Sequence, residues 1–152
     1  MSSAQNPKTI ELYGYGCQHE ATALGEILPG MLVERAAGGV QAHSSAGDVA
    51  NSSFANEYAL TGGTIDRAYE EDDQVIFTTY NPGSGIYGWI ADAVDASEGD
   101  FLTSAGDGTL AVAGDDEVAI AQAVESVDNT AGGAPARIRI EVMNAARTAP
   151  AA

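Results

Sequence analysis

Residues 94–127 read VDASEGDFLTSAGDGTLAVAGDDEVAIAQAVESV, a stretch in which short apolar runs alternate with Gly-Asp pairs. Two of these runs, residues 101–104 and 109–113, flank Gly106, Asp107 and Gly108. An Asp-Gly pair between such runs is typical of a tight β-hairpin turn. A calcium loop needs several oxygen ligands at short fixed spacing, and SAGDGTL does not supply them. The stretch therefore predicts a hairpin and no metal site.

The same alternation of short apolar runs with turn residues extends through most of the chain and indicates the fold class. Residues 74–80 contain VIFTTY, the strongest β-run, and it is followed by the turn signal Asn81-Pro82-Gly83. Many short apolar runs separated by Gly, Pro and Asp are typical of a small all-β sandwich or barrel. We therefore expect a mainly β domain over residues 27–144. Its other predicted strands cover residues 31–34, 40–43, 53–59 and 86–91.

The last two segments of the predicted domain differ in how clearly they can be assigned. Residues 117–127 alternate as a strand does, yet they also fit a helical stripe and are rich in alanine. We favour a strand there because turn signals flank the segment, and the helix stays open as an alternative. Residues 137–143, RIRIEVM, alternate cleanly and predict the closing strand.

Both ends of the chain are expected to lie outside the domain. Residues 1–26 are polar and irregular apart from TIELY at residues 9–13, so they predict an extended N-terminal arm that carries one short strand. Residues 145–152 are mostly alanine and predict a flexible C-terminal tail.

Charge is the most distinctive bulk property of the chain. Its 22 acidic residues face 6 basic ones, which gives a net charge of -16, and Lys8 is the single lysine. Such a field repels phosphate backbones and disfavours direct binding of nucleic acid. The acids are spread along the chain, so they do not form an acidic tail, and this composition favours a halophilic proteome over an ordinary acidic mesophilic one. The sequence has no apolar leader and no run of about 18 apolar residues, so we expect neither export nor a membrane partner.

Residues capable of metal or nucleophile chemistry are sparse. Cys17, His19 and Glu20 lie close together, but a zinc site needs three or four ligands and the other histidine is His43. With a single cysteine the chain has no intramolecular disulfide. Trp89 is expected to be a core or subunit-interface aromatic. We therefore expect no catalytic residue, no metal and no cofactor.

One short segment favours an enzymatic alternative. Gly63, Thr64, Ile65, Asp66 and Tyr69 resemble the GxIDxxY motif of trimeric deoxyuridine triphosphatases, in which the Asp acts on the nucleophilic water and the Tyr packs the base. His43-Ser44-Ser45 is similar to the phosphate loop of that family, with His43 where its arginine belongs. Triphosphate chemistry needs cationic compensation, which this chain hardly offers. A degenerate nucleotide hydrolase therefore stays an alternative.

A second resemblance covers residues 27–142. In order, the segments are ILPGMLVE, GGVQAHSSAG, FANEYALTGGTIDRAYEEDDQVIF, NPGSGIYGWIADAVDASEGDFLTSAGDGTL, EVAIAQAVESVDN and ARIRIEV. This pattern resembles the small capsid decoration (cement) proteins of tailed viruses. Matching motifs include the Pro-Gly-x-Leu-Val opening, the Gly-Asp-x-Leu-x-Ser-x-Gly-x-Gly-x-Leu hairpin and the closing Arg-x-Arg-x-x-Val.

What this resemblance implies is a small β-barrel or sandwich-like (β-tulip-type) domain. It also implies a homotrimer on the outer surface of an icosahedral head, made in the host cytoplasm, that bridges major capsid subunits against the pressure of packaged DNA. The acidic composition would make the host a haloarchaeon. The arm would pair with a strand of the major capsid protein by strand addition, repeated over many copies. The residues expected to make this contact are Lys8, Thr9, Ile10, Glu11, Leu12, Tyr13 and Tyr15.

Another alternative is a capsid turret or receptor-binding module. Such a module would bind a host glycan or surface-layer protein, whereas a decoration protein binds empty capsids and leaves cells alone.

The acidic composition generates a prediction about salt. Lowering the salt concentration below about 0.5 M should reduce the melting temperature, because repulsion among the carboxylates is then less screened. Thermal unfolding followed by circular dichroism across a salt series measures this effect. A melting temperature that does not change with salt would contradict the halophilic interpretation.

Overall fold

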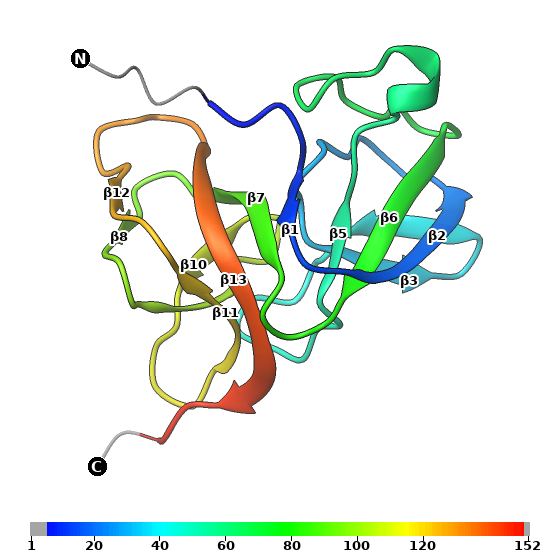
Figure 1. Cartoon of the computed structure of the whole chain (residues 1–152). Helices are drawn as coiled ribbons and strands as arrows, with labels where there is room; N and C mark the ends of the chain where they lie inside the picture. Colours follow the sequence, from blue (N-terminus) through cyan, green and yellow to red (C-terminus); the bar gives the residue numbers. More distant parts are fainter. Residues whose placement is uncertain (1–5, 151–152) are drawn as a thin grey trace.

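The computed structural model describes residues 6–150, and in this range the protein is mainly β. The strands form two groups that lie side by side, with β1 between them (Figure 1). One group is a barrel made largely by the second half of the chain, and the other is a smaller sheet with an attached hairpin. The predicted fold class is confirmed.

The barrel is closed by hydrogen bonds around a ring of strands. β7 pairs with β13 on one side and with β10 on the other, and β10, β9, β11 and β13 continue the ring. β1 adds to β7 beside β10, with Glu11 opposite Ile86. The strand bounds are β1 Glu11–Tyr13, β7 Gly85–Ile90, β9 Phe101–Ser104, β10 Leu110–Val112, β11 Val118–Ala123 and β13 Ala136–Arg147.

Strict alternation along β13 shows why this sequence closes the barrel. Ile138, Ile140 and Val142 are buried in the main core, while Arg139 and Glu141 between them are partly exposed. Successive side chains of a strand point to opposite faces, so one face of β13 packs inside the barrel and the other is partly exposed. The opposite strand β7 supplies Ile86 and Ile90 to the same core.

The smaller sheet has the order β2, β6, β5, and the β3–β4 hairpin packs against it around a second core that includes Val33, Val40 and Phe77. The bounds are β2 Gly16–Thr22, β3 Val33–Ala36, β4 Gly39–Ala42, β5 Ser53–Ala55 and β6 Gln74–Tyr80. Two short strands, β8 Asp95–Ala96 and β12 Val127–Asp128, pair beside the barrel, and a 3-10 turn, η1, covers Ala59–Thr61.

The hairpin predicted around Asp107 is present. β9 and β10 pair antiparallel with Ser104 opposite Leu110, and the Asp107 carboxylate accepts the Thr109 backbone N–H at 3.0 Å. Gly106 and Gly108 have φ of +91° and +86°, values that favour glycine. The strand favoured for residues 117–127 is also confirmed, as β11 followed by β12.

Residues 9–22 of the predicted arm are strands and turns of the domain instead of a free extension. β2 pairs with β6 over its full length, from Gly16 opposite Tyr80 to Thr22 opposite Gln74. Ile10 is fully buried in the main core. β2 could not be predicted from an apolar pattern, because GCQHEAT is an edge strand with polar side chains. Its backbone pairing does not depend on an apolar face. Residues 1–5 of the predicted arm lie outside the described residues.

The predicted C-terminal tail is also part of the domain as far as residue 149. β13 continues to Arg147, and the Thr148 N–H donates to the Glu117 carbonyl at 2.8 Å. The Asp116 N–H donates to the Ala149 carbonyl at 3.2 Å. Backbone pairing with β11 holds this end although its side chains carry no apolar alternation. Residues 151 and 152 lie outside the described range.

The burial of Ile10 generates a stability prediction. Replacing Ile10 with Ala should lower the free energy of unfolding by about 2–5 kcal/mol, as expected for an emptied core site. Denaturant unfolding at high salt, followed by Trp89 fluorescence, measures this change. Leu60→Ala is the control, because Leu60 is 88% exposed and its truncation should change the stability by less than about 0.5 kcal/mol. Equal effects of the two changes would contradict the integration of residue 10 into the core.

Candidate interaction surface

The longest connection between strands in residues 6–150 is the segment between β5 and β6, residues 56–73, which carries the short η1 turn. Figure 1 shows η1 at the upper right of the molecule. Two cavities flank this connection. One, of about 340 Å³, includes Tyr58 and is called the Tyr58 cavity; the other, of about 650 Å³, includes Arg137 and is called the Arg137 cavity. Long loops on a rigid scaffold are common sites of binding, so this end of the molecule is a candidate surface.

Arg137 anchors the wall between the connection and the barrel. From β13, its Nη1 donates to the Pro29 carbonyl at 2.8 Å and to the Tyr87 carbonyl at 3.1 Å. Its Nη2 donates to the Ile65 carbonyl and lies 3.5 Å from an Asp66 carboxylate oxygen. The guanidinium carbon also lies 3.9 Å from the centroid of the Trp89 ring.

These contacts leave Arg137 little capacity for a ligand. Burial lowers the pKa of Arg137 from its usual value, and the negative charge of Asp66 acts in the opposite direction. Both terminal nitrogens are bonded to the protein, and only the buried Nε lacks a partner within residues 6–150. Glu57, another residue of this cavity, accepts the Ile10 N–H at 3.0 Å. The Arg137 cavity is therefore held together by contacts within the chain.

The residues predicted to contact a capsid divide into buried and exposed sets. Ile10 is buried and Leu12 is half-buried, so neither side chain is free to meet a partner. The exposed members lie within residues 8–15, and we call them the N-terminal strip: Lys8, Thr9, Glu11, Tyr13 and Tyr15. Lys8 and Thr9 also line the Arg137 cavity.

Two tyrosines dominate the N-terminal strip. Tyr13 is 49% exposed and Tyr15 is 72% exposed. The Tyr13 ring lies against Gly85, where any side chain would collide with it, and its hydroxyl donates to Glu141 at 3.3 Å. The Ser84 hydroxyl accepts the Tyr15 N–H at 3.2 Å, so the backbone at Tyr15 is fixed while its ring stays exposed. Two held but exposed aromatic rings are typical anchors of protein interfaces.

The same region carries open sheet edges. Within the described chain, β1 is hydrogen-bonded to β7 and β2 to β6, and each is the outer strand of its sheet. An outer strand presents backbone N–H and C=O groups that can pair with another chain. The exposed tyrosines and the open edges therefore occur on the same part of the chain, residues 11–22.

Other residues singled out from the sequence do not form a site together. Cys17 and His19 point to one face of β2 and Glu20 to the other, and the His19 ring packs 5.3 Å from the Phe77 ring centroid. Across residues 6–150, no group of three or more His, Cys, Asp or Glu side chains is arranged to hold a metal ion. In the same range, no helix is long and apolar enough to cross a membrane.

His43 is buried, and both of its ring nitrogens are hydrogen-bonded within the chain. It is 4% exposed, its Nδ1 lies 2.6 Å from the Ser104 hydroxyl, and its Nε2 lies 3.0 Å from the Val49 carbonyl. The neighbouring Ser44 hydroxyl donates to the Glu34 carboxylate at 3.1 Å, and the Ser44 backbone N–H bond holds the pKa of Glu34 below its usual value. The Ser44 backbone N–H and hydroxyl are therefore already bonded to a carboxylate.

The two residues of the hydrolase motif lie in different cavities. Asp66 lines the Arg137 cavity and faces Arg137, whereas Tyr69 lines the Tyr58 cavity. Tyr69 is 6% exposed, and its hydroxyl donates to the Asn56 carbonyl at 2.6 Å. Burial raises the pKa of Tyr69 to about 12. The structure does not bring Asp66 and Tyr69 around one ligand.

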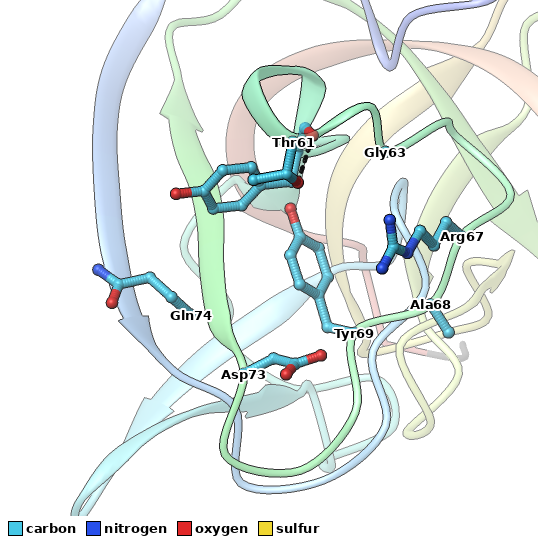
Figure 2. Close-up of a pocket in the computed structure, with 8 residues that line it drawn as sticks. Thr61, Gly63, Arg67, Ala68, Tyr69, Asp73 and Gln74 are labelled. Carbon is cyan, nitrogen blue, oxygen red and sulfur yellow. Dashed lines mark hydrogen bonds between the residues drawn. The ribbon is translucent and has the colours of Figure 1, made fainter.

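Sequence reasoning missed the Tyr58 cavity. Figure 2 shows Arg67 and Gln74 on opposite sides of Tyr69, with Asp73 below it. Thr61 and Gly63 lie on the far side of the cavity from Asp73, and the Thr61 hydroxyl donates to the Tyr58 carbonyl at 3.2 Å. The one sequence signal for it is the length of the segment between the strand residues Ala55 and Gln74.

Comparison with known proteins gives one informative result. No protein-family model matches the chain, and no curated protein matches it. A solved structure, the crystal structure of the head fiber gp8.5 N base in bacteriophage phi29, is similar with a TM-score of 0.54 and 14% sequence identity. The two chains share a fold. The similarity covers 84% of this chain and 94% of the phage chain.

The contacts of Arg137 generate a further stability prediction. Arg137→Lys should lower the free energy of unfolding by about 1.5–3 kcal/mol, because one ammonium cannot reach all three carbonyls or stack on Trp89. Thermal and denaturant unfolding measure the loss. Arg147→Lys is the matched control, because Arg147 is half-exposed and bonds to Asp116 at the chain end. If both variants retain full stability, Arg137 does not hold the loops.

Proposed function

We propose that this protein is a structural component of the head of a haloarchaeal tailed virus. It decorates the outer surface of the icosahedral head as a homotrimer and bridges major capsid subunits. The observation that carries this proposal is the fold shared with a bacteriophage head fiber base, which extends over 94% of that chain. The ordered motifs of residues 27–142, which resemble those of capsid decoration proteins, support it independently.

The contact with the capsid is assigned to the exposed surface of the N-terminal strip and to the open edges of β1 and β2. Ile10 is buried, so the strip contributes through Tyr13, Tyr15 and backbone groups and does not unfold as a loose arm. Strand addition at an outer edge forms backbone hydrogen bonds, and exposed tyrosines add aromatic contacts. Attachment through several subunits of a trimer multiplies a modest affinity per subunit.

The net charge of -16 favours this kind of contact over an electrostatic one. At molar salt the Debye length is about 3 Å, so ion pairs at a surface contribute little to affinity. Backbone hydrogen bonds and apolar contacts persist under these conditions. The same charge disfavours DNA as the partner, because the chain has six basic residues in total.

The nucleotide-hydrolase alternative gains no support from the geometry, since Asp66 and Tyr69 line separate cavities. An assay of deoxynucleoside triphosphate hydrolysis with Mg²⁺ tests it directly. The receptor-binding alternative is favoured by one observation, the Tyr58 cavity, which is considered below.

The decoration proposal is tested by co-sedimentation with undecorated capsids at high salt, with bound copies counted per capsid. We expect saturable binding in a fixed ratio to the major capsid subunits, and a trimer by analytical ultracentrifugation. Tyr15→Ala should weaken binding at least about tenfold, as for an aromatic anchor. Val49→Ala is the control, because Val49 is 69% exposed and lies outside the strip. Absence of saturable binding by the unaltered protein would overturn the proposal.

A further inference from the structure

The Tyr58 cavity combines aromatic walls with polar groups that still have hydrogen-bonding capacity. We propose that it binds a neutral sugar ring, as part of a glycan. Its volume of about 340 Å³ falls within the range of small-molecule sites, which are typically about 300–1,000 Å³. This inference concerns a surface separate from the N-terminal strip, so it does not depend on capsid binding.

The walls of the cavity are suited to the C–H face of a sugar. Tyr69 is buried, and its hydroxyl is already bonded to the Asn56 carbonyl. Its ring therefore contributes an apolar surface to the cavity lining. Tyr58 is half-buried and contributes a second aromatic residue to the lining, which also includes Ala68. Two aromatic residues give affinity without demanding charge on the ligand.

The polar side chains of the cavity offer the N–H donors of Arg67 and acceptor oxygens of Asp73 and Gln74. The Arg67 guanidinium makes no hydrogen bond or ion pair with any residue in the described range, so all its N–H donors are available. One carboxylate oxygen of Asp73 accepts the Glu70 N–H at 2.8 Å, which leaves the other oxygen free. The Gln74 amide nitrogen donates to Glu20 at 3.0 Å, which leaves its amide oxygen free.

This arrangement fits adjacent hydroxyl groups. Figure 2 shows Arg67 on one side of the Tyr69 ring and Asp73 with Gln74 on the other sides. Each sugar hydroxyl both donates and accepts hydrogen bonds. A ring placed on the tyrosines can therefore accept from Arg67 and donate to Asp73 or Gln74 at the same time. A ligand without such paired groups leaves one side of the cavity unsatisfied.

The charge around the cavity selects against anionic ligands. Glu70, Glu71, Asp72 and Asp73 are consecutive exposed acids in the turn that leads into β6. They outnumber the single cation Arg67, so phosphate, sulfate or uronate groups meet net repulsion. A neutral sugar avoids this cost.

The test is a ligand-observed NMR titration of the full chain at molar salt. The probes are the methyl glycosides of glucose, galactose and mannose, N-acetylglucosamine, and glucuronate as the anionic counterpart. We expect saturable, millimolar binding of at least one neutral sugar and weaker binding of glucuronate. Arg67→Gln should reduce the affinity for that sugar at least tenfold without changing the melting temperature, because Arg67 is exposed and unbonded. Arg147→Gln is the matched control and should bind as the unaltered protein does.

Three results would overturn this proposal: no binding of any neutral probe, tighter binding of glucuronate than of every neutral sugar, or unchanged affinity in both Arg67→Gln and Tyr58→Ala. Capsid co-sedimentation of Arg67→Gln is measured in parallel. We expect it to remain at the level of the unaltered protein. Loss of sugar binding with intact capsid binding, or the reverse, separates the two functions.

Discussion

The hydrogen bonds of the Arg137 guanidinium join the barrel to two loops of the smaller strand group. Arg137 is carried by β13 of the barrel, and its acceptors belong to three other segments, at Pro29, Ile65 and Tyr87. Gly30 has a φ of +95°, and a side chain there would collide with the arginine. A buried cation is costly unless its donors are satisfied, so the loops must stay where their carbonyls meet it. The Arg137 cavity has a wall fixed in this way, and Gly63 of the same connection lines both cavities.

Closure of the barrel leaves its own strands without free edges over much of their length, whereas β1 and β2 near the N-terminus are outer strands. β7, β10, β9, β11 and β13 use both of their edges within the ring, over at least part of their length. β1 joins the outside of this arrangement and leaves its own far edge open, and β2 does the same for the smaller sheet. Edges that can pair with another chain are a hazard in a protein that must stay monodisperse. In a protein that joins an assembly they are a means of attachment, which links the topology to the proposed function.

The elements predicted correctly from the sequence are those specified by local chemistry. Residues 74–80 form β6 and residues 101–104 form β9, because alternation and turn residues act over a few positions. β2 could not be found in this way, since its polar sequence becomes a strand through pairing with β6, from Gly16 opposite Tyr80 to Thr22 opposite Gln74, more than 50 positions away in the sequence. The buried His43 and the Arg137 contacts also depend on residues distant in sequence. Such long-range contacts follow from the packed fold, and no local pattern contains them.

The scarcity of cations makes their positions informative. Four of the six basic residues are engaged within the chain: Arg137 with carbonyls, Arg139 with Glu125 at 3.2 Å, Arg147 with Asp116 at 3.4 Å, and Arg35 over the Phe77 ring at 5.1 Å. Lys8 and Arg67 have no such partner within residues 6–150, and each lines one of the two cavities beside the β5–β6 connection. The rest of the surface is dominated by carboxylates. A ligand that accepts hydrogen bonds is therefore bound most favourably by these two unpaired cations. The end of the molecule that carries them is therefore the one best suited to recognition, whereas the tyrosines and strand edges of residues 11–22 are suited to assembly.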